Sequence, residues 1–197
     1  MLFIVGINFG LRVSDLLTLR FSHLITDSFT YRPEFKLLEK KTANTRSRKK
    51  NRCISINKAV REAINLYLVN TPDVKLSDYM FRSISNNGYS QNKPIHRNSV
   101  ERLLKGIAED LELPYHMSTH TLRKTFGYHQ MAMANHDHRK LLLLQKMFGH
   151  STSSQTLDYI GLTNEEMAEA YMEMNLGLRE KSRVDSVLME EQQGITA

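Results

Sequence analysis

Several features that mark common protein classes are missing from this 197-residue sequence. Its single cysteine, Cys53, excludes an internal disulfide and fits a reducing compartment. No apolar run approaches the roughly 18 residues of a membrane-spanning helix. The apolar opening, residues 1–10, has neither a basic n-region nor a small-residue cleavage site, so we interpret it as a buried helix and not as a signal peptide. We therefore expect a soluble, intracellular protein.

A metal site is not expected either. His129, His136 and His138 lie close together, but their spacing carries no framework of cysteines or carboxylates. What the chain does have is positive charge, with a formal net charge of +6 and a pI near 9.4. A surplus of lysine and arginine favours a polyanionic partner, although it is weak evidence alone.

Length and hydropathy patterning predict a mostly helical α+β domain. With 41% hydrophobic residues the chain can build a sizeable core. Helical spacing from Val13 through Leu16 and Leu17 to Arg20 predicts a helix after Gly10. Residues 28–56 alternate as two short strands around a polar turn, which predicts a small antiparallel hairpin.

Further helices follow from caps and apolar stripes. Asn57 is the predicted cap of a helix that ends near residue 71, and Asn98 or Ser99 caps the next one, after a turn-rich connector at residues 83–94. The apolar stripe of that next helix comprises Val100, Leu103, Leu104, Ile107 and Leu111. Two more helical stretches occupy residues 119–134 and 138–150. Residues 163–174 are predicted to form an amphipathic helix, and residues 178–197 are expected to be a frayed helix or a disordered tail.

Six residues with matching chemistry are spread over about three quarters of the chain. They are Arg12, Lys41, His120, Arg123, His150 and Tyr159. A phenolic oxygen can attack a phosphodiester without a metal if cations hold the charge that develops on phosphate and proton carriers are at hand. Each residue alone has a simpler explanation, such as a solvated arginine or a packing tyrosine. The combination indicates DNA strand transfer.

Three sequence boxes around these residues resemble those of the tyrosine recombinase, or phage integrase, family. GLRVSDLLTLR resembles its first arginine box, HTLRKTFG its His-x-x-Arg box, and FGHSTSSQTLDYIG its last box, in which a histidine precedes the tyrosine by nine positions. The similarity spans roughly residues 8 to 161. Family members normally carry an N-terminal DNA-clamping domain, and we expect it to be absent from this chain, with the catalytic domain at residues 1–177.

The expected roles follow from chemistry and from the resemblance. A free phenol has a pKa of about 10, so Tyr159 needs a proton acceptor, either His120 or a neighbouring arginine. Arg12 and Arg123 suit bidentate binding of the non-bridging phosphate oxygens. The resemblance implies that His150 completes this clamp, that Asp15 supports it, and that a hairpin lysine protonates the leaving 5′ oxygen. Lys41 matches best. Because the sequence does not fix the hairpin register, the nearby lysines stay alternative candidates for this proton donor: Lys36, Lys40, Lys49 and Lys50.

The basic turn of the hairpin is expected to touch DNA phosphates without reading bases. The expected DNA contacts are Arg46, Arg48, Lys49, Lys50 and Lys124. The resemblance implies double-stranded DNA as partner, a tetramer on paired sites formed from monomers in solution, and no cofactor or metal. It also implies a cytoplasmic, nucleoid-associated protein of bacterial or phage origin. Two alternatives stay open: a DNA-binding relative that has lost catalysis, and an enzyme resembling type IB topoisomerases.

Overall fold

The computed structural model describes residues 1–39, 51–85, 88–161 and 171–172. Contacts divide the chain into two units, Met1–Gly161 and Leu162–Ala197. In the second unit, Tyr171 and Met172 are helical and exposed. The rest of the amphipathic helix predicted at 163–174, and the tail predicted at 178–197, lie outside the described residues. Within the described part of the chain, no helix combines the length and hydropathy needed to cross a membrane.

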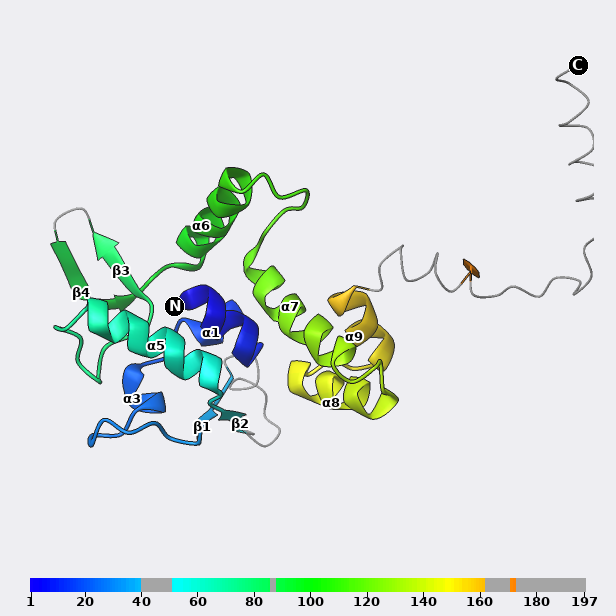
Figure 1. Cartoon of the computed structure of the whole chain (residues 1–197), viewed down its shortest axis with the longest axis horizontal. Coiled ribbons are helices and arrows are strands. Elements are labelled where there is room, and N and C mark those ends of the chain that lie inside the picture. Colours follow the sequence, from blue (N-terminus) through cyan, green and yellow to red (C-terminus); the bar gives the residue numbers. More distant parts are fainter. Residues whose placement is uncertain (40–50, 86–87, 162–170, 173–197) are drawn as a thin grey trace, which may run out of the picture. The chain divides into compact units, whose positions relative to one another are not determined.

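The first unit is mostly helical and carries two small antiparallel sheets, which confirms the predicted α+β class (Figure 1). Its helices are α1 (Leu2–Phe9), α2 (Val13–Leu16), α3 (Phe21–Leu24), α5 (Lys58–Asn70), α6 (Arg97–Asp110), α7 (Thr119–Ala132), α8 (His138–Phe148) and α9 (Ser153–Ile160). Its strands are β1 (Glu34–Leu37), β2 (Arg52–Ser55), β3 (Arg82–Ser85) and β4 (Gly88–Pro94).

The opening segment forms the predicted helix, α1, which packs against α5 and α7. Its burial is partial: Val5, Gly6 and Phe9 are buried, whereas Phe3 is 44% exposed. The helix ends at Gly10, whose φ of 55° lies in the left-handed region that glycine adopts without strain because it has no Cβ atom. The chain turns there and reaches Arg12, the N-cap of α2. The prediction that this helix continues to Arg20 was wrong, because α2 ends at Leu16. Arg20 instead pairs with Tyr79 in a β-bridge and caps α3.

The predicted hairpin is confirmed by antiparallel pairing of β1 with β2, in which Phe35 lies opposite Ile54. The connector reading of residues 83–94 was wrong, because β3 and β4 pair antiparallel there, with Ile84 opposite Tyr89. The β4 segment GYSQNKP is polar and lacks the alternation of a half-buried strand, so hydropathy did not reveal it.

The predicted cap of α5 is confirmed, since Asn57 Oδ1 accepts a hydrogen bond from the Val60 N–H at 3.0 Å. The predicted caps of α6 were wrong. That helix begins at Arg97 and its N-cap is His96, whose Nδ1 accepts the Asn98 N–H. The helix thus starts two or three residues earlier than a cap at Asn98 or Ser99 would imply. Arg97 is thereby fixed at the first position of α6.

The apolar stripe of α6 was only partly right. Val100 and Leu104 are buried, whereas the other predicted members are exposed by 47% to 64%: Leu103, Ile107 and Leu111. A helical stripe as wide as this one extends past the surface that α6 buries against the rest of the unit.

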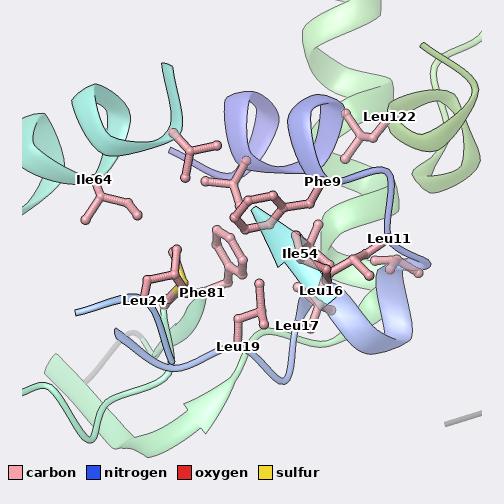
Figure 2. Close-up of a cluster of buried hydrophobic side chains, with 14 of the residues drawn as sticks. Phe9, Leu11, Leu16, Leu17, Leu19, Leu24, Ile54, Ile64, Phe81 and Leu122 are labelled. Atoms are coloured by element: carbon pink, nitrogen blue, oxygen red, sulfur yellow. The ribbon is translucent and has the colours of Figure 1, made fainter. Parts of the chain in front are cut away.

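Two hydrophobic clusters form the core of the first unit. In the larger one, Phe9 of α1 packs with Leu16 of α2 and Ile54 of β2 (Figure 2). The smaller one joins α7, α8 and α9 and includes Phe126 and Phe148. Helix α7 contributes to both clusters, so its first turns lie at their junction.

Candidate active site

The first arginine, Arg12, is placed by the turn at Gly10. Its Nη2 donates to the carbonyl oxygen of Phe148 at 2.8 Å, and its Nη1 to Glu39 Oε2 at 3.1 Å. Its side chain remains 23% exposed. Arg12 thus has one face fixed by the protein and another still open to a ligand.

The second arginine, Arg123, lies on α7 and is 2% exposed. It donates from Nη1 to Gly10 O at 2.8 Å and from Nη2 to Phe148 O at 2.9 Å. Its guanidinium carbon also lies 4.2 Å from the Phe148 ring centroid. Arg12 and Arg123 therefore meet at one carbonyl oxygen, although they come from opposite ends of the domain's sequence.

The left-handed turn after α8 makes this meeting possible. Gly149 has φ 62° and ends α8 directly after Phe148, which leaves the Phe148 carbonyl available to both guanidiniums. Burial, and next the nearby charge of Arg12, lower the pKa of Arg123 to about 10. Arg123 is still a cation at neutral pH, so the two arginines form a concentrated positive site.

The candidate nucleophile Tyr159, on α9, is half-buried against the smaller cluster. Its hydroxyl lies 3.2 Å from His120 Nδ1, within hydrogen-bond distance. The His150 ring is also near, 5.1 Å from the Tyr159 ring between centroids, and its Nδ1 lies 3.1 Å from Thr156 Oγ1. The structure thus brings together five of the six predicted residues: Arg12, His120, Arg123, His150 and Tyr159.

Electrostatics keep the Tyr159 phenol protonated. Desolvation by burial raises its pKa above the ordinary value, and the charges of Arg123 and Arg12 act in the opposite direction without cancelling it. A base must therefore accept the phenolic proton during any attack by this oxygen. His120 is at hydrogen-bond distance and can do so.

A spectroscopic titration measures this shift. The near-ultraviolet tyrosinate signal of Tyr159 is the difference between the titrations of the wild type and Tyr159→Phe. We expect its midpoint above pH 10, because the effect of desolvation on the pKa outweighs that of the two guanidinium charges. A midpoint below pH 10 in the DNA-free protein would show that the arginines dominate.

A pocket of about 110 Å³ opens beside these residues. Its lining consists of Leu11, Arg12, Val13, Ser14, Arg97, Thr119, His120 and Arg123. Three of the predicted residues, Arg12, His120 and Arg123, share it, and Tyr159 is joined to it by the contact with His120. Planar guanidiniums around a small pocket suit a tetrahedral oxyanion such as phosphate.

Two further residues that sequence reasoning missed support this arrangement. Glu39 lies between two arginines, at 3.1 Å from Arg12 and 3.1 Å from Arg52. Arg52 also donates to Met147 O at 3.2 Å and to Phe9 O at 3.1 Å. It therefore ties the β1–β2 hairpin to the ends of α1 and α8. Leu37 lies opposite Arg52 in the hairpin, and because the sequence does not fix this register, no sequence signal placed Arg52 beside Glu39.

Neutralising this carboxylate should weaken the fold. We expect Glu39→Gln to lower the free energy of unfolding by about 2 kcal/mol, less than the roughly 3–5 kcal/mol for a fully buried pair because the three side chains are 10% to 23% exposed. Urea unfolding measures it. In Glu62→Gln, the matched change at an exposed pair with Lys58, stability should not change measurably. Equal effects of the two substitutions would rule out this role of Glu39.

The structure describes only some of the remaining predicted residues. Lys41 and the basic turn residues Arg46, Arg48, Lys49 and Lys50 lie outside the described residues. Asp15 is 1% exposed in α2, one turn from Arg12, and its carbonyl accepts from Thr18 Oγ1 at 2.6 Å. Lys124 is exposed, with Nζ 5.8 Å from the Tyr159 ring centroid. Among the described residues, no group of three or more histidine, cysteine or acidic side chains could hold a metal ion.

Comparison with known proteins places this geometry in context. The sequence matches the profile of the phage integrase family over residues 2–166. It is 34% identical over 170 residues to the probable integrase/recombinase YoeC of Bacillus subtilis (strain 168), covering 86% of this chain and 81% of that protein. It is 26% identical over 122 residues to the tyrosine recombinase XerD of Halalkalibacterium halodurans, covering 62% of this chain and 39% of that protein.

Solved structures share the fold. The crystal structure of XerA recombinase superposes with a TM-score of 0.59 at 19% identity, over 89% of this chain and 56% of that chain. XerH site-specific recombinase, bound to its difH substrate in a pre-cleavage complex, gives 0.56 at 16% identity, over 89% of this chain and 46% of that chain. This chain therefore spans about half the length of these two solved chains.

Proposed function

This chain belongs to the phage integrase family of tyrosine recombinases, and from that premise we propose that it cuts and rejoins duplex DNA at specific sites through Tyr159. The observation that carries the proposal is the convergence of Arg12 and Arg123 beside a phenol that is hydrogen-bonded to His120. DNA is supported as the partner by the basic composition and by relatives solved in complex with DNA.

In the proposed reaction, Tyr159 Oη attacks the scissile phosphorus while His120 accepts the phenolic proton. Arg12 and Arg123 hold the non-bridging oxygens, on which negative charge grows, and His150 adds a hydrogen bond. The bond from phosphorus to the 5′ oxygen breaks, and a lysine of the hairpin, Lys41, protonates the leaving oxygen. The products are a 3′-phosphotyrosine and a free 5′ hydroxyl.

Rejoining follows from the same arrangement. The phosphotyrosine conserves the energy of the broken bond, so the 5′ hydroxyl of a second strand can attack it and release Tyr159 without nucleotide hydrolysis. Lys41 takes the proton of that hydroxyl, and His120 returns its proton to the Tyr159 oxygen. We propose that four copies assemble on two paired sites for this exchange, from monomers in solution, and that Asp15 supports the clamp from α2. The proposed catalytic domain spans residues 1–177, and its proposed origin is bacterial or phage-encoded.

A covalent-capture experiment tests the proposal. The protein is incubated in EDTA with supercoiled plasmid and a pool of nicked duplexes, quenched with SDS, and examined for protein–DNA adducts. We expect adducts, because a nick just beyond the cleavage site lets the short fragment with the free 5′ hydroxyl diffuse away. Rejoining is then prevented and the covalent intermediate accumulates. Salt-sensitive DNA binding without adducts would favour a relative that has lost catalysis. Plasmid relaxation by a monomer without site preference would favour a topoisomerase-like activity.

A further inference from the structure

The pocket beside Arg12 and Arg123 has a third arginine that the family boxes do not contain. Arg97 is the first residue of α6 and lines the pocket together with Arg12, His120 and Arg123. The three predicted residues come from the two arginine boxes, whereas Arg97 reaches the same pocket from a different helix. Its position depends on α6 starting at residue 97, which the sequence did not indicate.

A neighbouring carboxylate has the charge opposite to that of Arg97. Glu101, one turn further along α6, accepts the Thr119 N–H at 3.1 Å through Oε2 and so binds the start of α7. Desolvation raises the pKa of Glu101, but hydrogen bonds from Thr119 and the charges of Arg97 and His116 outweigh it and give a lowered pKa. Glu101 is therefore anionic at neutral pH and interacts favourably with the charge of Arg97.

Exposure separates Arg97 from the buried clamp. Arg123 is 2% exposed and donates hydrogen bonds to two backbone carbonyls. Arg12 donates to Phe148 O and to Glu39. Arg97 is exposed at the rim of the pocket. The Arg97 guanidinium is therefore accessible to a DNA strand whose scissile phosphate lies between Arg12 and Arg123.

We infer that Arg97 binds the phosphate next to the scissile one on the cleaved strand. This inference rests on the proposed function for the identity of the scissile phosphate. Arg97 contributes affinity and positions the strand, while the reacting phosphate is held by Arg12 and Arg123. It contacts the backbone and reads no base.

Salt dependence of binding measures the contact directly. The affinity of the full chain for a fluorescein-labelled random-sequence 30-base-pair duplex is followed by anisotropy from about 50 to 200 mM NaCl. One lost phosphate contact should make the slope of log K against log salt less steep by about 0.9 in Arg97→Ala. Arg97→Lys should retain the wild-type slope because it keeps the charge.

The matched control is Arg102→Ala, which removes the same charge from an exposed position of the same helix outside the pocket lining. We expect a wild-type slope there, and a rate of adduct formation in Arg97→Ala that falls by less than tenfold at saturating DNA. A wild-type slope in Arg97→Ala, or equal loss in Arg102→Ala, overturns the inference. A rate lowered more than tenfold at saturation also overturns it, because Arg97 would then act on the reacting phosphate. Absence of adducts in the wild type contradicts the proposed function and leaves the slope comparison intact.

Discussion

Replacing Tyr159 with phenylalanine is expected to abolish covalent attachment of the protein to DNA and to leave DNA binding intact. The substitution removes only the hydroxyl that lies 3.2 Å from His120 Nδ1, while the ring keeps its packing against Phe148 and His150. Without that oxygen the site has no phenol within reach of His120 to attack the phosphorus, so the loss should be complete. The measurement is adduct formation on nicked duplexes in SDS gels, beside anisotropy for binding.

Tyr128→Phe is the matched control. Tyr128 lies on α7, is 43% exposed and stacks edge-on with His129. The Tyr128→Phe variant should form adducts at the wild-type rate. Adducts of wild-type yield in Tyr159→Phe would contradict the assignment of the nucleophile, and loss of binding in that variant would mean that the hydroxyl serves the fold or the DNA interface.

Replacing Arg123 with alanine is expected to slow strand cleavage by about 10²–10³-fold, the usual effect of removing one donor that stabilises transition-state charge. Arg123 also bonds Gly10 O and Phe148 O, so its loss leaves two carbonyls without that donor and loosens the turn that carries Arg12. The effect should appear in the single-turnover cleavage rate at saturating DNA. DNA affinity should change much less, because the buried guanidinium is one of many cationic contacts.

Two variants separate catalysis from folding. Arg123→Lys keeps the charge but cannot donate in a planar fork, so it should fold and still cleave at least tenfold more slowly. Arg20→Ala removes an arginine that bonds Ser77 O and stacks on Tyr79, away from the site, and should lower the melting temperature without changing the cleavage rate at saturation. A folded Arg123→Lys with the wild-type rate would show that the guanidinium is not part of the clamp.

The sequence pointed to the members of the candidate site, but it did not reveal the surrounding residues that hold them in place. Arg12, His120, Arg123, His150 and Tyr159 were identifiable because their chemistry is specific and their boxes have fixed order. Glu39, Arg52 and Arg97 were missed. Their contacts depend on the strand register and on the exact start of α6, and neither follows from local hydropathy.

The fold shows the same division. Asn57 was recognised as a cap because its amide bonds a backbone N–H three residues away, a purely local interaction. The β3–β4 pair was missed because the β4 segment is polar and lacks the hydropathy alternation of a half-buried strand, although the two strands are neighbours in the sequence. The helix predicted through Arg20 was broken by the β-bridge between Arg20 and Tyr79, which lies far along the chain. In that second case long-range pairing overrode local propensity.

The most direct test of the proposed chemistry is to identify the residue and the DNA end joined in a trapped adduct. The adduct formed on nicked duplexes is digested with protease and nuclease, and the modified peptide is sequenced by tandem mass spectrometry. We predict a nucleotide attached through its 3′ phosphate to the oxygen of Tyr159, with a free 5′ hydroxyl on the released strand. Attachment to any other residue, or through a 5′ phosphate, would contradict the mechanism.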